Sequence, residues 1–498
     1  MNSLGQDKTN IMFALWQMHS KAADFHGNGQ SILKACHQAA ASGATCLVAP
    51  AFSISGYIAN HQKMRLDFLN KQQQVFDFLQ DNLPKDFILV LGSFSTAGQE
   101  VVALGTKIEN GIFAHRGVTI KVLIFNEISN RKSEIFAQKE DVDLLIVLDQ
   151  AFYVSGYCPQ KNLLMGQWSE HVPVLYVNTV GGQGGYIFCG QSQLIPAGDP
   201  FVHQVDFSEK LILTKPFAAG EKTSGDSATQ KEEYWYQALL AGIRYFVRDA
   251  GFSAVHLGLS GGIDSALVAT LAAGALGPEN VTGVLMPSRY SSEGSIRDAL
   301  ALAQNLGIST LTIDIEEMHC AAHRVLGEYF RMEGLVDENL QARIRGLFLM
   351  TYSNSCGSLL LNTGNKSELA VGYSTLYGDS CGMLTVIGDL WKTQVYQLCR
   401  YINDKLGKEI IPVTVLTKAP SAELRPNQKD QDSLPDYEVL DTVLDRYLQK
   451  EFSKESLVNE GYDVVVVERL IRLFHASAYK RAQAAPVLRL SSTAFGFE

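Results

Sequence analysis

Between residues 234 and 315, helical patterns alternate with three apolar, strand-like segments, and this run constrains the fold more than any other feature of the chain. The strand-like segments cover residues 255–259, 281–287 and 310–315, and the helical patterns cover residues 234–250, 264–276 and 292–306. A helix that joins two strands of one sheet makes them parallel neighbours, with a right-handed crossover. The second half of the chain is therefore expected to form a parallel α/β sheet.

A glycine-rich loop, Gly258-Leu259-Ser260-Gly261-Gly262-Ile263-Asp264-Ser265, joins the first strand to its helix. Glycines at 261 and 262 let the backbone turn tightly and approach an anion. The free amides and the dipole of the following helix favour that anion, and the hydroxyls of Ser260 and Ser265 add donors. The loop lies where open α/β sheets bind ligands, at the carboxyl end of a strand. It lacks the lysine of a Walker A loop and the spacing of the dinucleotide fingerprint.

Asp264 places a carboxylate in this anion-binding loop. A carboxylate beside a bare phosphate is repulsive, so its presence indicates a bridging Mg²⁺ ion. Asp264 also stands at the start of the predicted helix, where a short acidic side chain often caps the free amides. We expect one carboxylate to serve as metal ligand and helix cap together.

The first half of the chain also alternates strands with helices, which predicts a layered α/β fold without fixing its topology. Strands are expected over residues 11–17, 45–50, 87–94, 119–125, 143–148 and 174–177, and helices over residues 30–42 and 72–82. Residues 216–233 are polar, small and charged, which is typical of a linker. We place the domain boundary there and expect domains over residues 1–225 and 226–498.

Composition excludes several classes of function. The 42 basic and 52 acidic residues give a net charge of −10, which argues against a general binder of nucleic acid or anionic membranes. Apolar runs fall far short of the roughly 20 residues that span a bilayer, and residues 1–10 lack the apolar core of a signal peptide. None of the eight cysteines forms a C-x-x-C pair. Reduced thiols and a cytoplasmic location are therefore expected.

Further stretches identify a family. They are residues 285–292, 338–346, 361–368, 377–379, 392–396, 420–426, 431–435 and 479–481. The SGG-x-DS loop resembles the pyrophosphate loop of the ATP pyrophosphatases. The ordered set resembles NAD⁺ synthetase, in the form whose synthetase domain follows a glutaminase, nearly continuously over residues 234–496. The resemblance implies a doubly wound parallel-sheet domain of the ATP-pyrophosphatase type and at least a homodimer through it.

This resemblance implies a two-step ligase reaction. The nicotinate carboxylate of deamido-NAD⁺ attacks the α-phosphorus of ATP and releases pyrophosphate, and ammonia then displaces AMP. By resemblance, Asp264 and Glu368 match metal-associated carboxylates, Thr363 an ATP contact and Lys392 a phosphate contact, so that Asp264, Glu368 and Lys392 form the catalytic set. The deamido-NAD⁺ contacts are expected at Asn354, Glu368, Asp379 and Lys480, with Arg343 and Arg345 as candidates for the dinucleotide phosphates because a guanidinium fork suits them.

The first half resembles the nitrilase-type glutaminase, an α/β sandwich, over most of residues 8–215. The resemblance rests on residues 14–19, Gly27-Asn28, 50–57, 172–178, Gly181-Gly182-Gln183 and 188–192. Such enzymes use a glutamate base, a lysine at the oxyanion and a cysteine nucleophile. Here Ala51 stands at the base position and Phe125 at the nucleophile position. The lysine loop is missing between residues 110 and 118.

The sequence therefore predicts an NAD⁺ synthetase that takes free ammonia because its glutaminase residues are lost. Three alternatives stay open. The first is use of glutamine through an unrecognised or partner glutaminase site, for which Cys46 and Cys158 are the nearest cysteines. The second is amidation of nicotinate mononucleotide instead of the dinucleotide. The third is a non-catalytic regulatory or scaffold protein, against which the intact loop and Glu368 argue.

Overall fold

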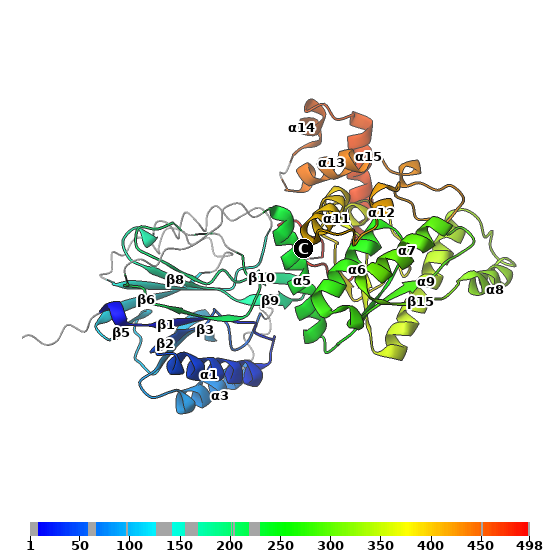
Figure 1. The fold of residues 1–498 in the computed structure, drawn as a ribbon. Coiled ribbons are helices and arrows are strands. Elements are labelled where there is room, and N and C mark those ends of the chain that lie inside the picture. The colour runs from blue at the N-terminus through cyan, green and yellow to red at the C-terminus, as the bar shows by residue number, and fades with distance from the viewer. Residues whose placement is uncertain are drawn as a thin grey trace, which may run out of the picture. The chain divides into compact units, whose positions relative to one another are not determined.

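The computed structural model describes residues 8–57, 66–95, 98–125, 142–154, 168–200, 202, 205–218, 230–449 and 452–496. The chain divides into two compact units (Figure 1). The first comprises residues 1–183 and 187–229, and the second comprises residues 184–186 and 230–498. The predicted boundary at residue 225 lies outside the described residues and stays a prediction.

The first unit contains two five-stranded sheets of similar design. In each, three parallel strands lie between two antiparallel edge strands. One sheet has the order β12 (Lys210–Thr214), β1 (Phe13–Gln17), β2 (Cys46–Val48), β3 (Ile88–Ser95), β4 (Gly98–Leu104). The other has the order β11 (Gln193–Ile195), β8 (Val174–Val177), β7 (Leu144–Asp149), β6 (Val118–Phe125), β5 (Ile112–His115). Strands β9 (Val180–Gln183) and β10 (Tyr186–Cys189) form a separate pair, and a short 3₁₀ turn, η1 (Lys8–Asn10), precedes β1.

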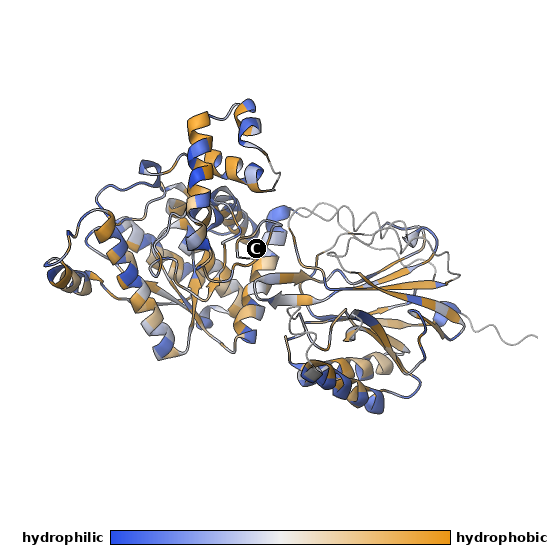
Figure 2. Cartoon of the chain, turned by 180° about the vertical axis from the view of Figure 1, so that it is seen from behind, coloured by the Kyte–Doolittle hydropathy of each residue, from blue (hydrophilic) through white to orange (hydrophobic). Residues whose placement is uncertain are grey.

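One apolar core joins the two sheets of this unit. Leu15 and Leu89 of one sheet and Ile120 and Ile146 of the other belong to the same buried cluster. Because side chains alternate across a strand, β6 also presents a second face, whose Leu123 and Phe125 pack in a smaller cluster. Helices α1 (Phe25–Ala41) and α3 (Leu66–Asn82) pack on each other, with hydrophilic residues outward (Figure 2). The predicted nitrilase-like α/β sandwich is confirmed.

The second unit is built on a five-stranded parallel sheet, of which the sequence predicts the parallel arrangement and three of the strands. Its order is β15 (Ser309–Thr312), β14 (Val281–Leu285), β13 (Val255–Gly258), β16 (Leu359–Asn362), β17 (Leu384–Thr385). The chain runs outward in one direction from β13 to β15 and then crosses to the other side of β13. Right-handed crossovers place helices on both faces of such a sheet. The point where the order reverses, between β13 and β16, is where open α/β sheets bind ligands.

Helices and short turns complete the second unit. The first group comprises α5 (Lys231–Asp249), α6 (Ile263–Leu276), η2 (Pro278–Asn280), α7 (Glu293–Leu306), α8 (Glu316–Leu326) and α9 (Leu335–Cys356). The second comprises α10 (Lys366–Val371), α11 (Lys392–Leu406), α12 (Val413–Thr417), η3 (Asp430–Asp432), α13 (Tyr437–Gln449), α14 (Lys454–Asn459), α15 (Val464–Ala476) and α16 (Ala478–Arg481). Among the described residues, no helix is long and apolar enough to cross a membrane.

A fully buried ion pair fixes the start of α10. Lys366 Nζ lies 2.6 Å from Asp389 Oδ1 and donates to Ser491 Oγ at 3.0 Å, and neither charged side chain of the pair is exposed. Breaking a buried pair by removing one partner typically costs about 3–5 kcal/mol. The pair therefore holds the loop that ends β16 and opens α10 in one arrangement.

Most predicted elements form close to their expected bounds, but the weaker patterns were missed. Strands β4, β5, β9 to β12, β16 and β17 were not predicted because they are short or partly exposed. The seven cysteines within the described residues are all free, as expected, and Cys158 lies outside them.

Candidate functional site

The glycine-rich loop follows β13 and opens α6, at the switch point of the sheet. Gly261 has φ +77°, and a Cβ there would lie 2.1 Å from the backbone oxygen of Ser295, so only glycine fits. Ser260 Oγ lies 3.1 Å from Ser265 Oγ and accepts from the Gly262 amide at 3.2 Å. The serine hydroxyls thus bond to each other and to the loop backbone, which holds the turn in place.

Asp264 does not cap α6, and that prediction was wrong. The N-cap position is Gly262, and no side chain caps the helix. The Asp264 carboxylate instead accepts from Asn365 Nδ2 at 3.0 Å and from Lys392 Nζ. It is the second residue of the helix, two positions past the N-cap, and it turns toward Asn365 and Lys392 at the starts of α10 and α11.

Glu368 reaches the same place through a capping box on α10. The Asn365 side chain accepts from the Glu368 amide at 3.0 Å, and Glu368 Oε2 accepts from the Asn365 amide at 3.2 Å. This reciprocal pair fixes the Glu368 rotamer at the first turn of the helix. Its other oxygen, Oε1, lies 3.6 Å from Lys392 Nζ. One asparagine therefore orients both carboxylates, because its amide nitrogen also binds Asp264.

Lys392 lies between these carboxylates with a side chain only 3% exposed. Burial alone would lower the pKa of Lys392, but Asp264 and Glu368 raise it above its usual range, so the lysine stays charged. Burial first, and then the Asp264 charge, raise the pKa of Glu368 to about 8. Asp430 adds a third acid nearby: burial raises its pKa, while Tyr437 donates to it at 2.8 Å. The cluster holds more acid than one lysine neutralises.

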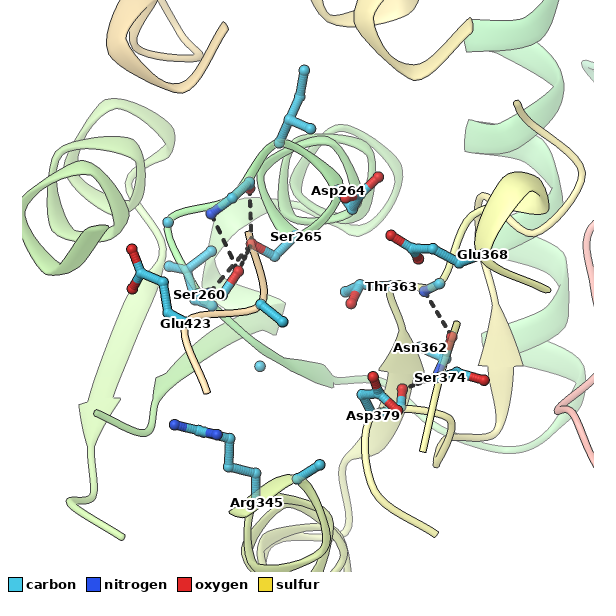
Figure 3. Close-up of a pocket in the computed structure, with 18 of the residues that line it drawn as sticks. Ser260, Asp264, Ser265, Arg345, Asn362, Thr363, Glu368, Ser374, Asp379 and Glu423 are labelled. Atoms are coloured by element: carbon cyan, nitrogen blue, oxygen red, sulfur yellow. Dashed lines mark hydrogen bonds between the residues drawn. The ribbon is translucent and has the colours of Figure 1, made fainter. Parts of the chain in front are cut away.

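A cavity of about 320 Å³ opens at this point of the sheet (Figure 3). Asp264 and Glu368 lie at one end of it, and Arg345 of α9 lies on the opposite side. Burial lowers the pKa of Arg345 to about 10, which leaves it charged at neutral pH. The predicted site residues that line the cavity are Gly258, Ser260, Gly261, Gly262, Asp264, Ser265, Arg345, Thr363, Glu368, Asp379 and Lys392.

Three predicted residues do not line this cavity. Arg343 and Asn354 are exposed on α9, although the Arg343 Nε donates to the backbone oxygen of Leu376 at 3.2 Å. Lys480 of α16 donates to the backbone oxygens of Gly372 and Ser374, at 2.7 and 2.6 Å. These donations hold the segment that leads to Asp379, and Ser374 itself lines the cavity.

Sequence reasoning missed a polar group on the far side of the loop. Glu423 accepts from Ser295 Oγ at 2.7 Å and from Lys418 Nζ at 3.0 Å, and it also binds Ser292 at the start of α7. Despite partial burial, these bonds lower the pKa of Glu423. The stretch 420–426 carried the family resemblance, so its residues could have been proposed. Asn365 could have been found from the N-x-x-E capping pattern that it forms with Glu368.

The strand ends of the first unit look different. Ala51 follows β2, is 1% exposed, and its amide lies 3.3 Å from the backbone oxygen of Asp149. Phe125 ends β6 and packs edge-on against Trp168, with ring centroids 6.5 Å apart. Strands β5 and β6 are joined by a two-residue turn, Arg116-Gly117, in which both residues have positive φ. The pairing of His115 with Val118 leaves no longer loop there.

Comparison with known proteins extends this picture. The NAD synthase family model matches residues 235–484. A glutamine-dependent NAD(+) synthetase of Synechocystis sp. is 37% identical, with 97% of this chain and 96% of that protein aligned. The corresponding enzyme of Thermotoga maritima is 35% identical, with 98% and 97% aligned. A solved glutamine-dependent NAD⁺ synthetase of Acinetobacter baumannii, in complex with ADP, is 30% identical with a TM-score of 0.75 over 98% of this chain and 97% of that one.

The glycine-rich loop and the cavity at the switch point of the parallel sheet, together with the α/β sandwich ahead of it, fit a ligase of the NAD synthase type. The family match and full-length relatives are more specific. The chain belongs to the NAD⁺ synthetase family, in the two-domain form of the glutamine-dependent enzymes.

Proposed function

We propose that this chain converts deamido-NAD⁺, ATP and ammonia into NAD⁺, AMP and pyrophosphate, and that it does not hydrolyse glutamine. The synthetase residues support the first part, because a glycine-rich anion loop, a buried lysine and two carboxylates converge on one cavity. The altered strand ends of the first unit support the second part. A cytoplasmic location belongs to the same proposal.

The loop residues 258–265 would receive the β- and γ-phosphates of ATP as the pyrophosphate leaving group. Their free amides and the start of α6 offer positive potential without moving. Lys392 would neutralise charge on the departing phosphates from its buried position beside Asp264 and Glu368. Thr363 lines the cavity at the end of β16 and would contact ATP.

The acidic cluster fits a Mg²⁺ ion. Hard cations take carboxylate oxygens, and Asp264, Glu368 and Asp430 offer them around one lysine. Burial and, after it, repulsion from Asp264 raise the pKa of Glu368, and a divalent cation would relieve that repulsion. When bound, Mg²⁺ would neutralise charge on the phosphates. Asp264 and Glu368 would hold the ion, oriented for this by Asn365.

Deamido-NAD⁺ would enter from the α9 side of the cavity. Arg345 and Asp379 line the cavity, and Lys480 holds the neighbouring segment. Arg343, Leu347 and Asn354 share one exposed helical face at spacings of four and seven residues, and Leu347 is 53% exposed. Such a face, with an exposed apolar side chain between two polar ones, fits contact with a second copy of the chain. That copy would complete the dinucleotide site. Light scattering of the purified chain would test for the expected dimer.

One observation carries the ammonia assignment: all three glutaminase positions lack the group that the chemistry needs. Ala51 has no proton acceptor, Phe125 has no nucleophile, and the two-residue turn at 116–117 has no room for the lysine loop. The alignment with the Synechocystis relative runs over 543 positions, against 498 residues here, so that relative carries segments that this chain lacks. Burial raises the pKa of Cys46 and raises that of Cys36 to about 12, so neither thiol is an activated nucleophile. Cys158 lies outside the described residues.

A second candidate is favoured by the names of the relatives, which are glutamine-dependent enzymes. In that case glutamine would be hydrolysed at another site of this chain or by a partner protein. Incubating the purified chain with glutamine and measuring glutamate separates the two. No glutamate above the buffer rate supports the ammonia assignment, and glutamate released in proportion to enzyme contradicts it.

The substrate assignment needs its own test. Pyrophosphate release is measured with deamido-NAD⁺ and, in parallel, with nicotinate mononucleotide. We expect at least tenfold higher kcat/KM for the dinucleotide. Equal values would favour the mononucleotide alternative, and no pyrophosphate with either would favour a non-catalytic protein.

A further inference from the structure

Within the second unit, two histidines and an aspartate lie close together, away from the residues proposed for catalysis. His319 and His323 lie four residues apart on α8, which places them on one face of the helix. Asp337 comes from the first turn of α9. The His319 Nε2 lies 2.7 Å, and the His323 Nε2 2.5 Å, from the same Asp337 Oδ1. One ligand atom from each residue falls within 4.8 Å of the other two.

We propose that His319, His323 and Asp337 bind one first-row transition-metal ion, for which Zn²⁺ is the best match. Imidazole nitrogen and carboxylate oxygen are common zinc ligands, at about 2.0–2.2 Å from the ion. Tetrahedral bonds of that length put ligand atoms about 3.4 Å apart. The three side chains reach that spacing by small movements, and His323 has room to move because its side chain is 34% exposed.

The surroundings suit an ion. The three residues line a cavity of about 500 Å³, so an ion and a water molecule can enter. Three protein ligands leave a fourth position open, and we assign it to water. Cys320 lines the same cavity, but its Sγ lies 3.3 Å from Glu316 Oε1 and 3.5 Å from an Arg289 nitrogen, so it is already engaged.

A buried amide orients the carboxylate, as is usual for metal ligands. Gln341 is fully buried, and its Nε2 donates to Asp337 Oδ2 at 3.1 Å, which leaves Oδ1 for the histidines. The same nitrogen donates to the backbone oxygen of Leu424 at 3.0 Å. Leu424 lines both this cavity and the cavity beside the glycine-rich loop. A metal ion here would tie α8 to α9 and to the segment beside the phosphate loop.

Binding of metal to the full-length, tag-free chain tests the proposal. Zn²⁺ is titrated by calorimetry in millimolar Mg²⁺, which occupies the acidic cluster at Asp264. Co²⁺ is titrated separately for its visible absorption. We expect one Zn²⁺ per chain, tetrahedral Co²⁺ bands and a rise in the unfolding temperature on metal binding. No saturable Zn²⁺ binding to the unmodified chain would overturn the proposal and leave a hydrogen-bonded cluster.

Variants assign the ligands. His323→Asn and Asp337→Asn should each weaken Zn²⁺ binding by at least about tenfold. His475→Asn, an exposed helical histidine of the same unit, and Cys320→Ser should bind as the unmodified chain does. Unchanged affinity in both ligand variants, or loss only in Cys320→Ser, would overturn the assignment. If a ligand variant does not fold, X-ray absorption of the Zn²⁺-loaded unmodified chain decides, since a site without two imidazole ligands contradicts the proposal.

Discussion

The strand ends of the two units differ sharply, although both units place parallel strands where α/β folds build sites. In the second unit, the ends of β13 and β16 carry charged and hydroxyl side chains that hold one another around a cavity. In the first unit, the ends of β2 and β6 carry Ala51 and Phe125, which pack against their surroundings. A fold of this kind therefore needs its strand interiors, whereas its chemistry depends on a few residues just beyond them.

The strand interiors of the first unit explain why it keeps its fold. Every residue of β2, β7 and β8 is buried, and the two sheets share one core. Burying a large apolar side chain contributes about 1.5–3 kcal/mol. Replacing a glutamate or cysteine at a strand end removes none of this contribution. The proposed loss of glutaminase catalysis is therefore compatible with retention of the sandwich.

The largest effect is expected from a substitution that breaks the charge cluster of the second unit. Lys392→Met should lower the rate of pyrophosphate release by at least about a hundredfold, because the leaving group loses a fixed positive charge. Lys405→Met is the matched control: this lysine is on the same helix and pairs with Glu233. It should keep the rate. A folded Lys392→Met chain with normal pyrophosphate release would contradict the proposed role.

Glu368→Gln tests the same charge cluster through the pH dependence of stability. In the unfolded chain Glu368 ionises near its ordinary pKa of 4.5, and in the folded chain it does so near about 8. The folded state thus binds more protons between these values, and the stability that Glu368 contributes falls as pH rises through that window. Without Mg²⁺ and nucleotide, the unfolding temperature of the unmodified chain should fall more from pH 5.5 to 8 than that of the variant. Parallel pH profiles would refute the raised pKa.

The same variant should lose activity when Mg²⁺ is saturating. We expect kcat/KM to fall more than about tenfold, which corresponds to about 1.4 kcal/mol of transition-state stabilisation. Unchanged kinetics would make Glu368 a helix cap only.

A smaller effect is expected at the exposed face of α9. Arg343→Ala should raise KM for deamido-NAD⁺ by about tenfold, since a charge-assisted hydrogen bond contributes about 1.5 kcal/mol or more. The KM for ATP should stay unchanged. Arg248→Ala, in the last turn of α5, is an exposed arginine that should leave both values unaltered. Equal effects of Arg343→Ala on both substrates would argue against a dinucleotide contact.

The smallest effect is expected from restoring one lost group. Phe125→Cys should release no more glutamate from glutamine than the unmodified chain, because residues of a catalytic unit act together. The base and the oxyanion lysine would still be missing. Glutamate release by this variant, measured against the unmodified chain, would show that another acid and cation already stand in place.

The parallel sheet and the glycine-rich loop could be predicted because their signals are local. Buried parallel strands read as short apolar runs, and Gly261 and Gly262 mark the turn. Local patterns could not pair Asp264 with Asn365 and Lys392, which lie 101 and 128 residues away along the chain; only the family resemblance placed Lys392 in the same site. Local reasoning gave Asp264 a cap that the long-range ion pair replaces. The edge strands were not predicted because their local signal is weak. In β4, for example, only one of the seven residues is buried, so the apolar pattern is slight.

The nitrogen source tests the central claim most directly. NAD⁺ formation from deamido-NAD⁺ and ATP is measured with ammonium or with glutamine as the only nitrogen donor, and an enzymatic ammonia trap is added to the glutamine reaction. The account predicts NAD⁺ with ammonium and none above background with glutamine. Addition of a separate glutaminase to the glutamine reaction without the trap should restore synthesis. NAD⁺ formed from glutamine by the chain alone, with the trap active, would contradict the account.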